Sequence, residues 1–250
     1  MQLVLLTAFG VGGATIIGAC LGFMTKKASH SFSDIIMGFA AGVMLSAAVI
    51  GLVMPSLEYG TKPYGLIVTI AGIFCGALCL NLIDKLVPHL HGIAGMNGSS
   101  SEGQLDKILL FVVAIGIHNL PEGIAAGVSF GTENVADALL VAGGIALQNI
   151  PEGMVIIAPM LAVGVKPMRT FLIAAATGLI EVVGTLVGFF AVNISVAILP
   201  FALAFAGGTM IYVVSDEMIP ETHAHGNEIG ATYALLIGFC VMIGMDYLLG

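Results

Sequence analysis

HNLPEG, residues 118–123, recurs thirty residues later as QNIPEG, residues 148–153. Each of these hexads lies inside a long apolar stretch, and each places a glutamate directly after a proline. A carboxylate in the hydrocarbon core of a membrane costs roughly 2.5–3.5 kcal/mol on insertion scales, so it is normally retained because function requires it. The two hexads therefore predict one polar site at membrane depth, around which the rest of the chain is organised.

The composition of the chain is that of an integral membrane protein. Of its 250 residues, 58% are apolar and only 9% are charged, whereas soluble domains carry about 25% charged residues. The 34 glycines favour helices that lie close together in a lipid bilayer. Seven lysine and arginine residues spread along the chain exclude a nucleic-acid-binding surface, because such a surface needs a basic patch.

The apolar stretches predict an all-α polytopic membrane protein with eight transmembrane helices in a single domain, residues 1–250. A helix needs about 20 apolar residues to cross the hydrocarbon core. The connections are short except at residues 88–106, where glycine and serine indicate a flexible loop. The predicted spans are residues 3–24, 34–57, 64–87, 107–130, 134–161, 168–192, 196–219 and 230–249.

The basic residues predict the orientation of the chain. An even number of spans places both termini on the same side of the membrane. If that side is extracytoplasmic, six of the seven basic residues lie on the cytoplasmic side with the flexible loop, in agreement with the positive-inside rule. The six are Lys26, Lys27, Lys85, Lys107, Lys166 and Arg169, and Lys62 alone lies outside.

An internal repeat relates the first three spans to the last three at an offset of 166 residues. Residues 39–44 of the second span match residues 205–210 of the seventh. Corresponding spans are five helices apart, so the two copies have opposite orientations, as in the inverted repeats of secondary transporters. Spans 4 and 5, which carry the hexads, then lie at the centre. The glycine pairs at the same offset are Gly18 and Gly184, Gly22 and Gly188, and Gly72 and Gly238.

Each hexad gathers polar side chains on one face of its helix. His118 and Glu122 are four residues apart, a spacing that places two residues on the same side of a helix. Gln148, Asn149 and Glu152 repeat the arrangement in the next span. The proline of each hexad kinks its helix and frees a backbone carbonyl, which must find another partner in lipid. The freed carbonyls add to the predicted polar site.

The predicted site is rich in anions, with no lysine or arginine at that depth. Glu181, in the middle of the sixth span, joins Glu122 and Glu152. Three unpaired carboxylates repel one another, and a divalent cation removes this repulsion. Imidazole and carboxylate ligands without thiolate suit Zn²⁺, Fe²⁺, Mn²⁺, Co²⁺ and Cd²⁺. Glu122 and Glu152 could bridge two ions, with His118 and Gln148 completing one position and Asn119, Asn149 and Glu181 the other.

Three other interpretations of the buried glutamates are open. They could form a polar cluster that only joins helices, although interhelical hydrogen bonds rarely need three carboxylates. They could relay protons in a proton-linked carrier or channel, which leaves the His–Glu spacing and the amides unexplained. They could serve an intramembrane metallo-hydrolase, but the chain has no His-Glu-x-x-His motif and no nucleophile in register. Metal transport without catalysis accounts for more of the residues.

Polar residues at the ends of two spans indicate a route to and from the site. Glu58, at the outer end of the second span, could attract cations at an entrance or could simply meet water there. At the cytoplasmic end of the seventh span, acids and histidines could receive an ion that leaves the site. The possible exit residues are Asp216, Glu217, Glu221, His223 and His225, together with His89 and His91 near the cytoplasmic loop.

The two hexads and the segment DEMIPETH, residues 216–223, closely resemble the motifs of the ZIP (Zrt-, Irt-like protein) divalent-metal transporters. Gln148 at the start of the second hexad is similar to the bacterial GufA-like branch. The resemblance extends over all eight spans. It implies uptake of Zn²⁺ and related ions into the cytoplasm by alternating access, a 3+2+3 arrangement of helices, and a homodimer in the bacterial inner membrane. The metal is then a substrate, and no cofactor is expected.

The resemblance also implies the ligands of a binuclear site. Some relatives carry histidine where Gln148 stands and aspartate where Asn149 stands. The two amides lower the negative charge of the site. The first ion would take His118, Glu122, Gln148 and Glu152, and the second Asn119, Glu122, Asn149, Glu152 and Glu181.

Overall fold

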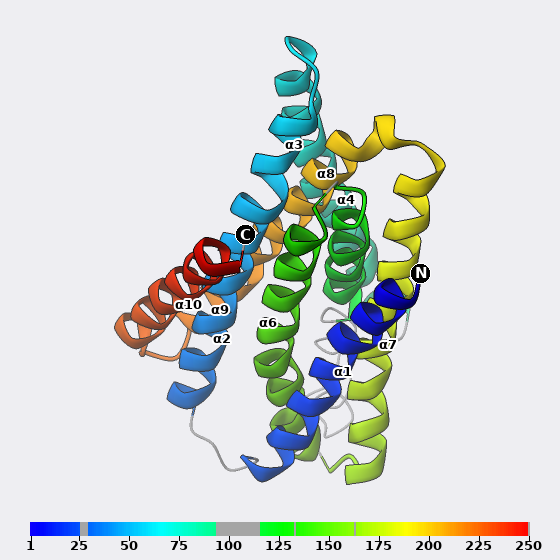
Figure 1. Cartoon of the computed structure of the whole chain (residues 1–250). Helices are drawn as coiled ribbons and strands as arrows, with labels where there is room; N and C mark the ends of the chain where they lie inside the picture. The colour runs from blue at the N-terminus through cyan, green and yellow to red at the C-terminus, as the bar shows by residue number, and fades with distance from the viewer. Residues whose placement is uncertain (26–29, 94–115, 133, 163, 250) are drawn as a thin grey trace.

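The computed structural model describes residues 1–25, 30–93, 116–132, 134–162 and 164–249, except for the side chains of residues 84, 86–93, 196 and 249 (Figure 1). In this part of the chain all regular structure is helical, which confirms the predicted all-α class. The helices are α1 (Gln2–Met24), α2 (His30–Ser46), η1 (Ala47–Val53), α3 (Met54–Tyr59), α4 (Tyr64–Ile93), α6 (Val135–Ala162), α7 (Pro167–Ile194), η2 (Val196–Ile198), α8 (Leu199–Val213), η3 (Val214–Met218), α9 (Ile219–Thr222) and α10 (Glu228–Leu249).

Seven helical stretches among the described residues are long and apolar enough to cross a membrane, and they correspond to seven of the eight predicted spans. The predicted span at residues 107–130 is described only from residue 116, and residues 116–129 are helical. The predicted start of the loop at residue 88 is wrong, because α4 continues to Ile93. Leu86, Leu90 and Ile93 extend the helical apolar spacing past that point. Residues 94–106 lie outside the described residues.

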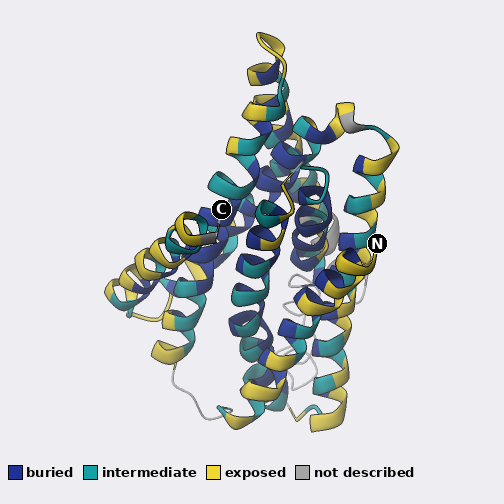
Figure 2. Ribbon diagram, viewed as in Figure 1, coloured by how far each residue is buried: buried dark blue, intermediate teal, exposed yellow. Residues whose placement is uncertain are grey.

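Large apolar side chains cover the outside of the helical bundle. Leu6 and Phe9 of α1, Phe74 of α4 and Ile237 of α10 are all exposed. Figure 2 shows exposed residues along the outer sides of the helices and buried residues where the helices face one another. An exposed apolar surface of this extent is suited to contact with lipid.

The two copies of the internal repeat make corresponding helix contacts. Gly42 lies where α2 meets α10, and a Cβ added to it would be 1.9 Å from the carbonyl oxygen of Leu235. Gly208, at the offset of 166, lies where α8 meets α4, and its Cβ would be 2.3 Å from the carbonyl oxygen of Ile73. Only glycine permits helix backbones to approach so closely. Thus α2 contacts α10 in the same way that α8 contacts α4.

A wide π-helical turn interrupts both helices that carry these glycines. The turn η1 follows α2 and precedes Pro55, and the turn η3 follows α8 and precedes Pro220. A proline ring clashes with the carbonyl four residues earlier in a regular helix. A π-helical turn is one of the local adjustments that relieve such a clash, and these turns are frequent at functional sites. The turn η3 contains Glu217, one of the predicted exit residues.

The glycine that ends each hexad determines how the hexad helix crosses its neighbour. A Cβ at Gly153 of α6 would be 2.2 Å from the carbonyl oxygen of Thr15 in α1. A Cβ at Gly123 would be 2.3 Å from the carbonyl oxygen of Glu181 in α7. Thr15 and Glu181 are again separated by 166 residues. The two hexad glycines therefore contact equivalent positions of the two repeat copies.

The contact at Gly153 predicts a stability difference between two glycine substitutions. Gly153→Ala should destabilise the protein by about 1–3 kcal/mol, because the methyl group must push α1 and α6 apart. Gly13→Ala on α1 is the control, since no atom lies within 4 Å of its added Cβ. The control should be neutral or slightly stabilising, as alanine favours helix. Thermal unfolding of the two purified variants in detergent tests this, and equal midpoints would contradict the close approach.

Candidate metal site

Both hexads are helical, and their polar side chains face the interior. The first hexad lies in the helical residues 116–129, and the second lies in α6 with Pro151 inside the helix. Every residue predicted from the sequence to hold an ion is buried. These residues are His118, Asn119, Glu122, Gln148, Asn149, Glu152 and Glu181.

Hydrogen bonds bring three of these residues into one cluster. Glu181 of α7 accepts a hydrogen bond from the side-chain amide of Asn119 at 2.5 Å and one from that of Asn149 at 2.5 Å. Thr15 of α1 donates a third hydrogen bond to Glu181 at 2.7 Å. The cluster thus joins both hexad helices to α1 and α7, and it includes Thr15, which the sequence analysis did not identify. The separation of 166 residues between Thr15 and Glu181 is the signal that could have found it.

Glu122, Glu152 and Gln148 offer oxygen atoms that make no hydrogen bond of regular geometry with the described residues. Both carboxylate oxygens of Glu122, one of Glu152, and the side-chain oxygen and nitrogen of Gln148 are buried without a hydrogen bond of regular geometry, although the amide of Gln148 lies close to Glu122. The charges of Glu122 and Glu152 are close enough to repel one another, and Glu152 is also close to His118. Buried polar atoms are nearly always satisfied in proteins. A group of unsatisfied anionic oxygens is therefore an electrostatic environment that attracts a cation.

Glu217 contacts the first hexad directly. The Nε2 atom of His118 lies 2.6 Å from a carboxylate oxygen of Glu217. Glu217 comes from η3 at the end of α8, so the exit segment predicted from the sequence reaches the hexad itself. The ring nitrogen that would bind a metal is engaged with this carboxylate.

A cavity of about 380 Å³ leads away from the hexads on this side. Its lining includes His118 and Glu152 at one end and the acids Asp216, Glu217 and Glu221 of the exit segment. A second cavity of about 490 Å³ shares Glu221 with the first and continues towards the start of α2. The two cavities share lining residues, and together they extend from His118 and Glu152 to the start of α2, with acids among their mainly apolar lining.

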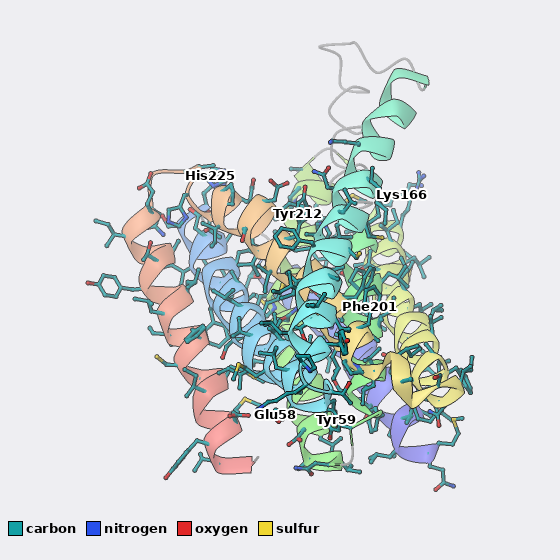
Figure 3. All side chains as sticks on the ribbon, turned by 90° about the horizontal axis from the view of Figure 1, so that it is seen from above. Glu58, Tyr59, Lys166, Phe201, Tyr212 and His225 are labelled. Atoms are coloured by element: carbon teal, nitrogen blue, oxygen red, sulfur yellow. The ribbon has the colours of Figure 1, made fainter. Side chains whose placement is uncertain are left out.

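Apolar side chains fill the space on the other side of the hexads. Val141 and Ile145 precede Gln148 on α6 by about two turns and one turn. Both are buried in one apolar cluster with Met44 of α2. Glu58, the predicted entrance residue, is exposed on α3 at the opposite end of the bundle from His225 (Figure 3). The site is therefore closed by apolar side chains towards Glu58 and open towards the predicted exit.

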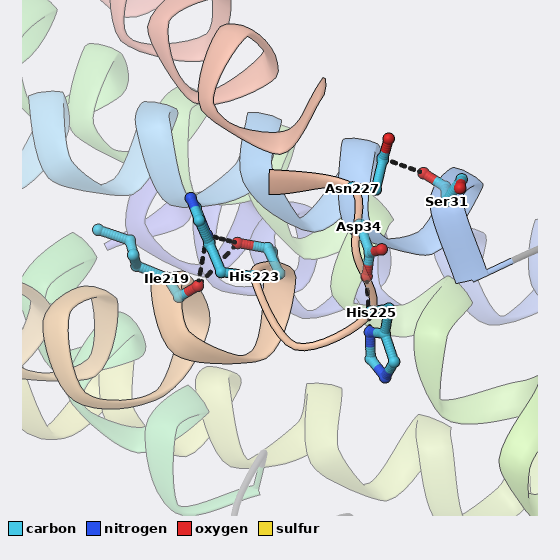
Figure 4. Close-up of polar contacts among 7 residues, drawn as sticks. Ser31, Asp34, Ile219, His223, His225 and Asn227 are labelled. Atoms are coloured by element: carbon cyan, nitrogen blue, oxygen red, sulfur yellow. Dashed lines mark hydrogen bonds and ion pairs between the residues drawn. The ribbon is translucent and has the colours of Figure 1, made fainter. Parts of the chain in front are cut away.

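The structure places the predicted exit histidines in different surroundings. His225 lies 3.0 Å from Asp34 of α2 and stacks on His30, and all three residues line the second cavity. His223 instead contacts the carbonyl oxygen of Ile219 at 2.8 Å (Figure 4), and it also contacts the hydroxyl groups of two threonines, which anchors the end of α9. The side chains of His89 and His91 lie outside the described residues. Buried Asp34 was missed because a single acid at the start of a predicted span is usually solvated.

Among the predicted ligands, His118 and Glu181 are held by protein partners in this conformation. Among the described residues, no three His, Cys, Asp or Glu side chains are arranged to hold a metal ion as they stand. His118 is engaged with Glu217, and Glu181 with the two asparagine amides. To bind an ion through His118, the site must release Glu217.

A bundle of apolar helices that encloses imidazole, amides and carboxylates beside a cavity that acids help to line has the architecture of an integral membrane cation transporter. Comparison with known proteins makes the class specific. Residues 88–246 match the model of the ZIP Zinc transporter family. The chain belongs to this family, and it is not an enzyme.

Relatives over nearly the whole chain support the same assignment. The chain is 38% identical over 244 residues to the zinc transporter GufA of Myxococcus xanthus, and the aligned region covers 96% of each chain. It is 38% identical over 242 residues to the zinc transporter ZIPB of Bordetella bronchiseptica, covering 95% of this chain and 78% of that one. It is 31% identical over 331 residues to the human zinc transporter ZIP11, covering 98% and 97% of the two chains. The similarity to GufA agrees with the GufA-like character predicted from Gln148.

The contact between His118 and Glu217 predicts that removing the carboxylate strengthens metal binding. Glu217→Gln should lower the Kd for Zn²⁺ by about 3- to 10-fold, because a neutral amide holds the imidazole less strongly than a carboxylate does. Competition of the purified protein with a zinc-binding dye measures this Kd. Glu228→Gln is the control, since it removes an exposed charge at the start of α10, and it should leave the Kd near the wild-type value. Weaker binding by Glu217→Gln than by the control would mean that Glu217 holds the ion rather than competing for His118.

Proposed function

We propose that this protein carries divalent transition-metal ions, zinc foremost, across the membrane into the cytoplasm through the site formed by the two hexads. The observation that supports this most strongly is the set of buried, unpartnered oxygens of Glu122, Glu152 and Gln148 beside a cavity that acids help to line. A cation would satisfy these oxygens and remove the repulsion between the two carboxylates. Membership of a family of zinc transporters points to the same cargo.

The ligands fit a transport site better than a permanent metal site. His118, Glu122, Gln148 and Glu152 supply one imidazole, one amide and two carboxylates, and this is the first ion position predicted from the sequence. Transport requires binding that is strong enough to remove water from the ion and weak enough to release it. A neutral amide in place of a third charged ligand meets that compromise. Such a nitrogen and oxygen set also accepts Fe²⁺, Mn²⁺, Co²⁺ and Cd²⁺.

The exit segment provides a sequence of partners for a departing ion. Glu217 already contacts His118. Its carboxylate can therefore bind the departing ion and can also take the place of the ion at His118. Asp216 and Glu221 line the same cavity, and the second cavity adds Asp34 and His225 beyond them. Each step exchanges one ligand for another of similar chemistry, which keeps the ion coordinated in a low-dielectric interior.

Alternating access requires the opposite state, in which the site opens towards Glu58. In the present conformation Met44, Val141 and Ile145 fill that side. We propose that the hexad helices move against the two repeat copies, in the way common among transporters with inverted repeats. The apolar cluster would separate while the cavity beside Glu217 closes.

The membrane arrangement predicted from the sequence is part of the proposal. Seven described helices and the helical residues 116–129 are compatible with eight spans in a 3+2+3 plan, with both termini extracytoplasmic in the bacterial inner membrane. The corresponding glycine contacts of the two repeat copies support the inverted repeat. A homodimer, implied by the family resemblance, stays a prediction. The metallo-hydrolase and the proton-linked carrier are less favoured, because the family and its relatives are zinc transporters.

Zinc flux into proteoliposomes that contain a metal-sensing dye tests the proposed function. His118→Ala and Glu152→Ala should reduce the initial rate by at least about tenfold, since each removes a ligand of the ion. Glu228→Ala is the control, because this glutamate is exposed at the start of α10. Labelling of a cysteine introduced by Lys62→Cys with an impermeant reagent reports which vesicles carry the extracytoplasmic side outward. Wild-type flux in both site variants, or flux only in the outward direction, would contradict the proposal.

A further inference from the structure

We infer that Glu181 is a positioning residue and not an ion ligand: together with Thr15, it holds the side-chain amides of Asn119 and Asn149 so that their oxygens stay free for the ion. This inference rests on the proposed function and concerns the same site. It replaces the second ion position predicted from the sequence with a network of hydrogen bonds, and it leaves one transported ion for each chain.

The hydrogen bonds of Glu181 leave little capacity for a metal. One carboxylate oxygen accepts from Thr15 at 2.7 Å and from Asn119 at 2.5 Å, and the other accepts from Asn149 at 2.5 Å. An ionised carboxylate has about four lone-pair sites, and three donors occupy both of its oxygens here. Glu122 has no hydrogen bond of regular geometry on either oxygen. The two glutamates therefore have different surroundings, although both carboxyl groups are buried in the predicted site.

The orientation of the two amides follows from the chemistry of the carboxylate. An ionised carboxylate can only accept hydrogen bonds, so each asparagine must turn its NH₂ group towards Glu181. The amide is planar, and its oxygen then points away from Glu181. Consistent with this, the side-chain oxygens of both Asn119 and Asn149 are buried and have no hydrogen-bond partner. Glu181 thus produces two unsatisfied neutral oxygens without offering its own.

Helix α1 completes the network from the opposite side. The amide of Asn149 also donates to the backbone carbonyl of Val11 at 3.2 Å, and Thr15 lies one turn further along α1. Both NH₂ hydrogens of Asn149 therefore have acceptors, and each of the two hydrogen bonds favours the same orientation of the amide. The close contact of Gly12 with Gly178 brings α1 and α7 near enough for Thr15 to reach Glu181.

Asn149 is the residue that makes this arrangement possible. An aspartate at the same position would place a second carboxylate against Glu181, and neither group could donate a hydrogen bond to the other. The two anions would then need a cation between them. The amide removes that requirement, which explains why a chain with Asn149 can hold Glu181 without a second ion.

The test measures how many Zn²⁺ ions bind to the purified full-length chain and with what Kd. Wild type should bind one ion, and Asn149→Asp should bind two. Thr15→Val should raise the Kd about 3- to 10-fold at unchanged stoichiometry, because the network loses a donor. Thr15→Ser, which keeps the hydroxyl group, should restore the wild-type Kd. Thr7→Val, another buried threonine of α1, is the matched control and should not change the Kd.

If Glu181 were a ligand of the ion, both the number of bound ions and the change in Kd would differ from these expectations. Wild type would bind two ions, and Thr15→Val would bind Zn²⁺ as tightly as wild type or more tightly, since a donor that competes for Glu181 is gone. Either result would overturn the inference. These results would leave the proposed function intact, whereas a wild-type chain that neither binds nor carries Zn²⁺ would overturn the proposed function itself.

Discussion

Three glutamate carboxyl groups are buried within one helical bundle, and each must find hydrogen-bond donors or a cation there. The ion pair that the structure places at this region joins Glu217 to His118. The protein meets the requirement of the buried glutamates in two ways. Hydrogen bonds from a hydroxyl and two amides satisfy Glu181, while Glu122 and Glu152 keep free oxygens. A transported cation can satisfy Glu122 and Glu152, whereas the hydrogen bonds of Glu181 join the helices around them.

Glycine contacts allow this polar centre to form between otherwise apolar helices. Gly153 brings α6 against α1, and Gly123 brings the first hexad helix against α7. Without these approaches the short side chains of Thr15 and Asn149 could not reach Glu181. The prolines that precede the glycines in each hexad loosen the same helices, so the polar residues lie at points where the backbone is both close to a neighbour and free to adjust.

The sequence predicted most of the elements and the composition of the site, because both depend on local pattern. Apolar length located the spans, and the spacing within each hexad placed His118 and Glu122 on one face. The predicted end of the third span, at residue 87, was wrong. Proline and glycine near residue 90 indicate a loop, but the apolar spacing of the helix continues to Ile93. The pairing of atoms could not be predicted in this way. Whether Glu181 meets an ion or an amide depends on how α1 and α7 cross.

The contact of His118 with Glu217 is another pairing of atoms that could not be predicted from the sequence. Both residues were identified from the sequence, one in the central site and one in the exit. Their distance of 2.6 Å arises because the π-helical turn η3 reaches the first hexad. A turn of this kind has no reliable local signature beyond the proline that follows it. The predicted exit segment and the first hexad are therefore in direct contact.

X-ray absorption spectroscopy of the zinc-loaded protein would show whether the hexads hold the ion, because it reports the atoms bound to the metal. The hexad site predicts nitrogen and oxygen ligands at about 2.0–2.1 Å with a single imidazole, and no sulfur at about 2.3 Å. The imidazole contribution should disappear in His118→Ala. A spectrum with two or more imidazoles or with sulfur would contradict the account, since it would place the ion among the loop histidines or cysteines instead of at the hexads.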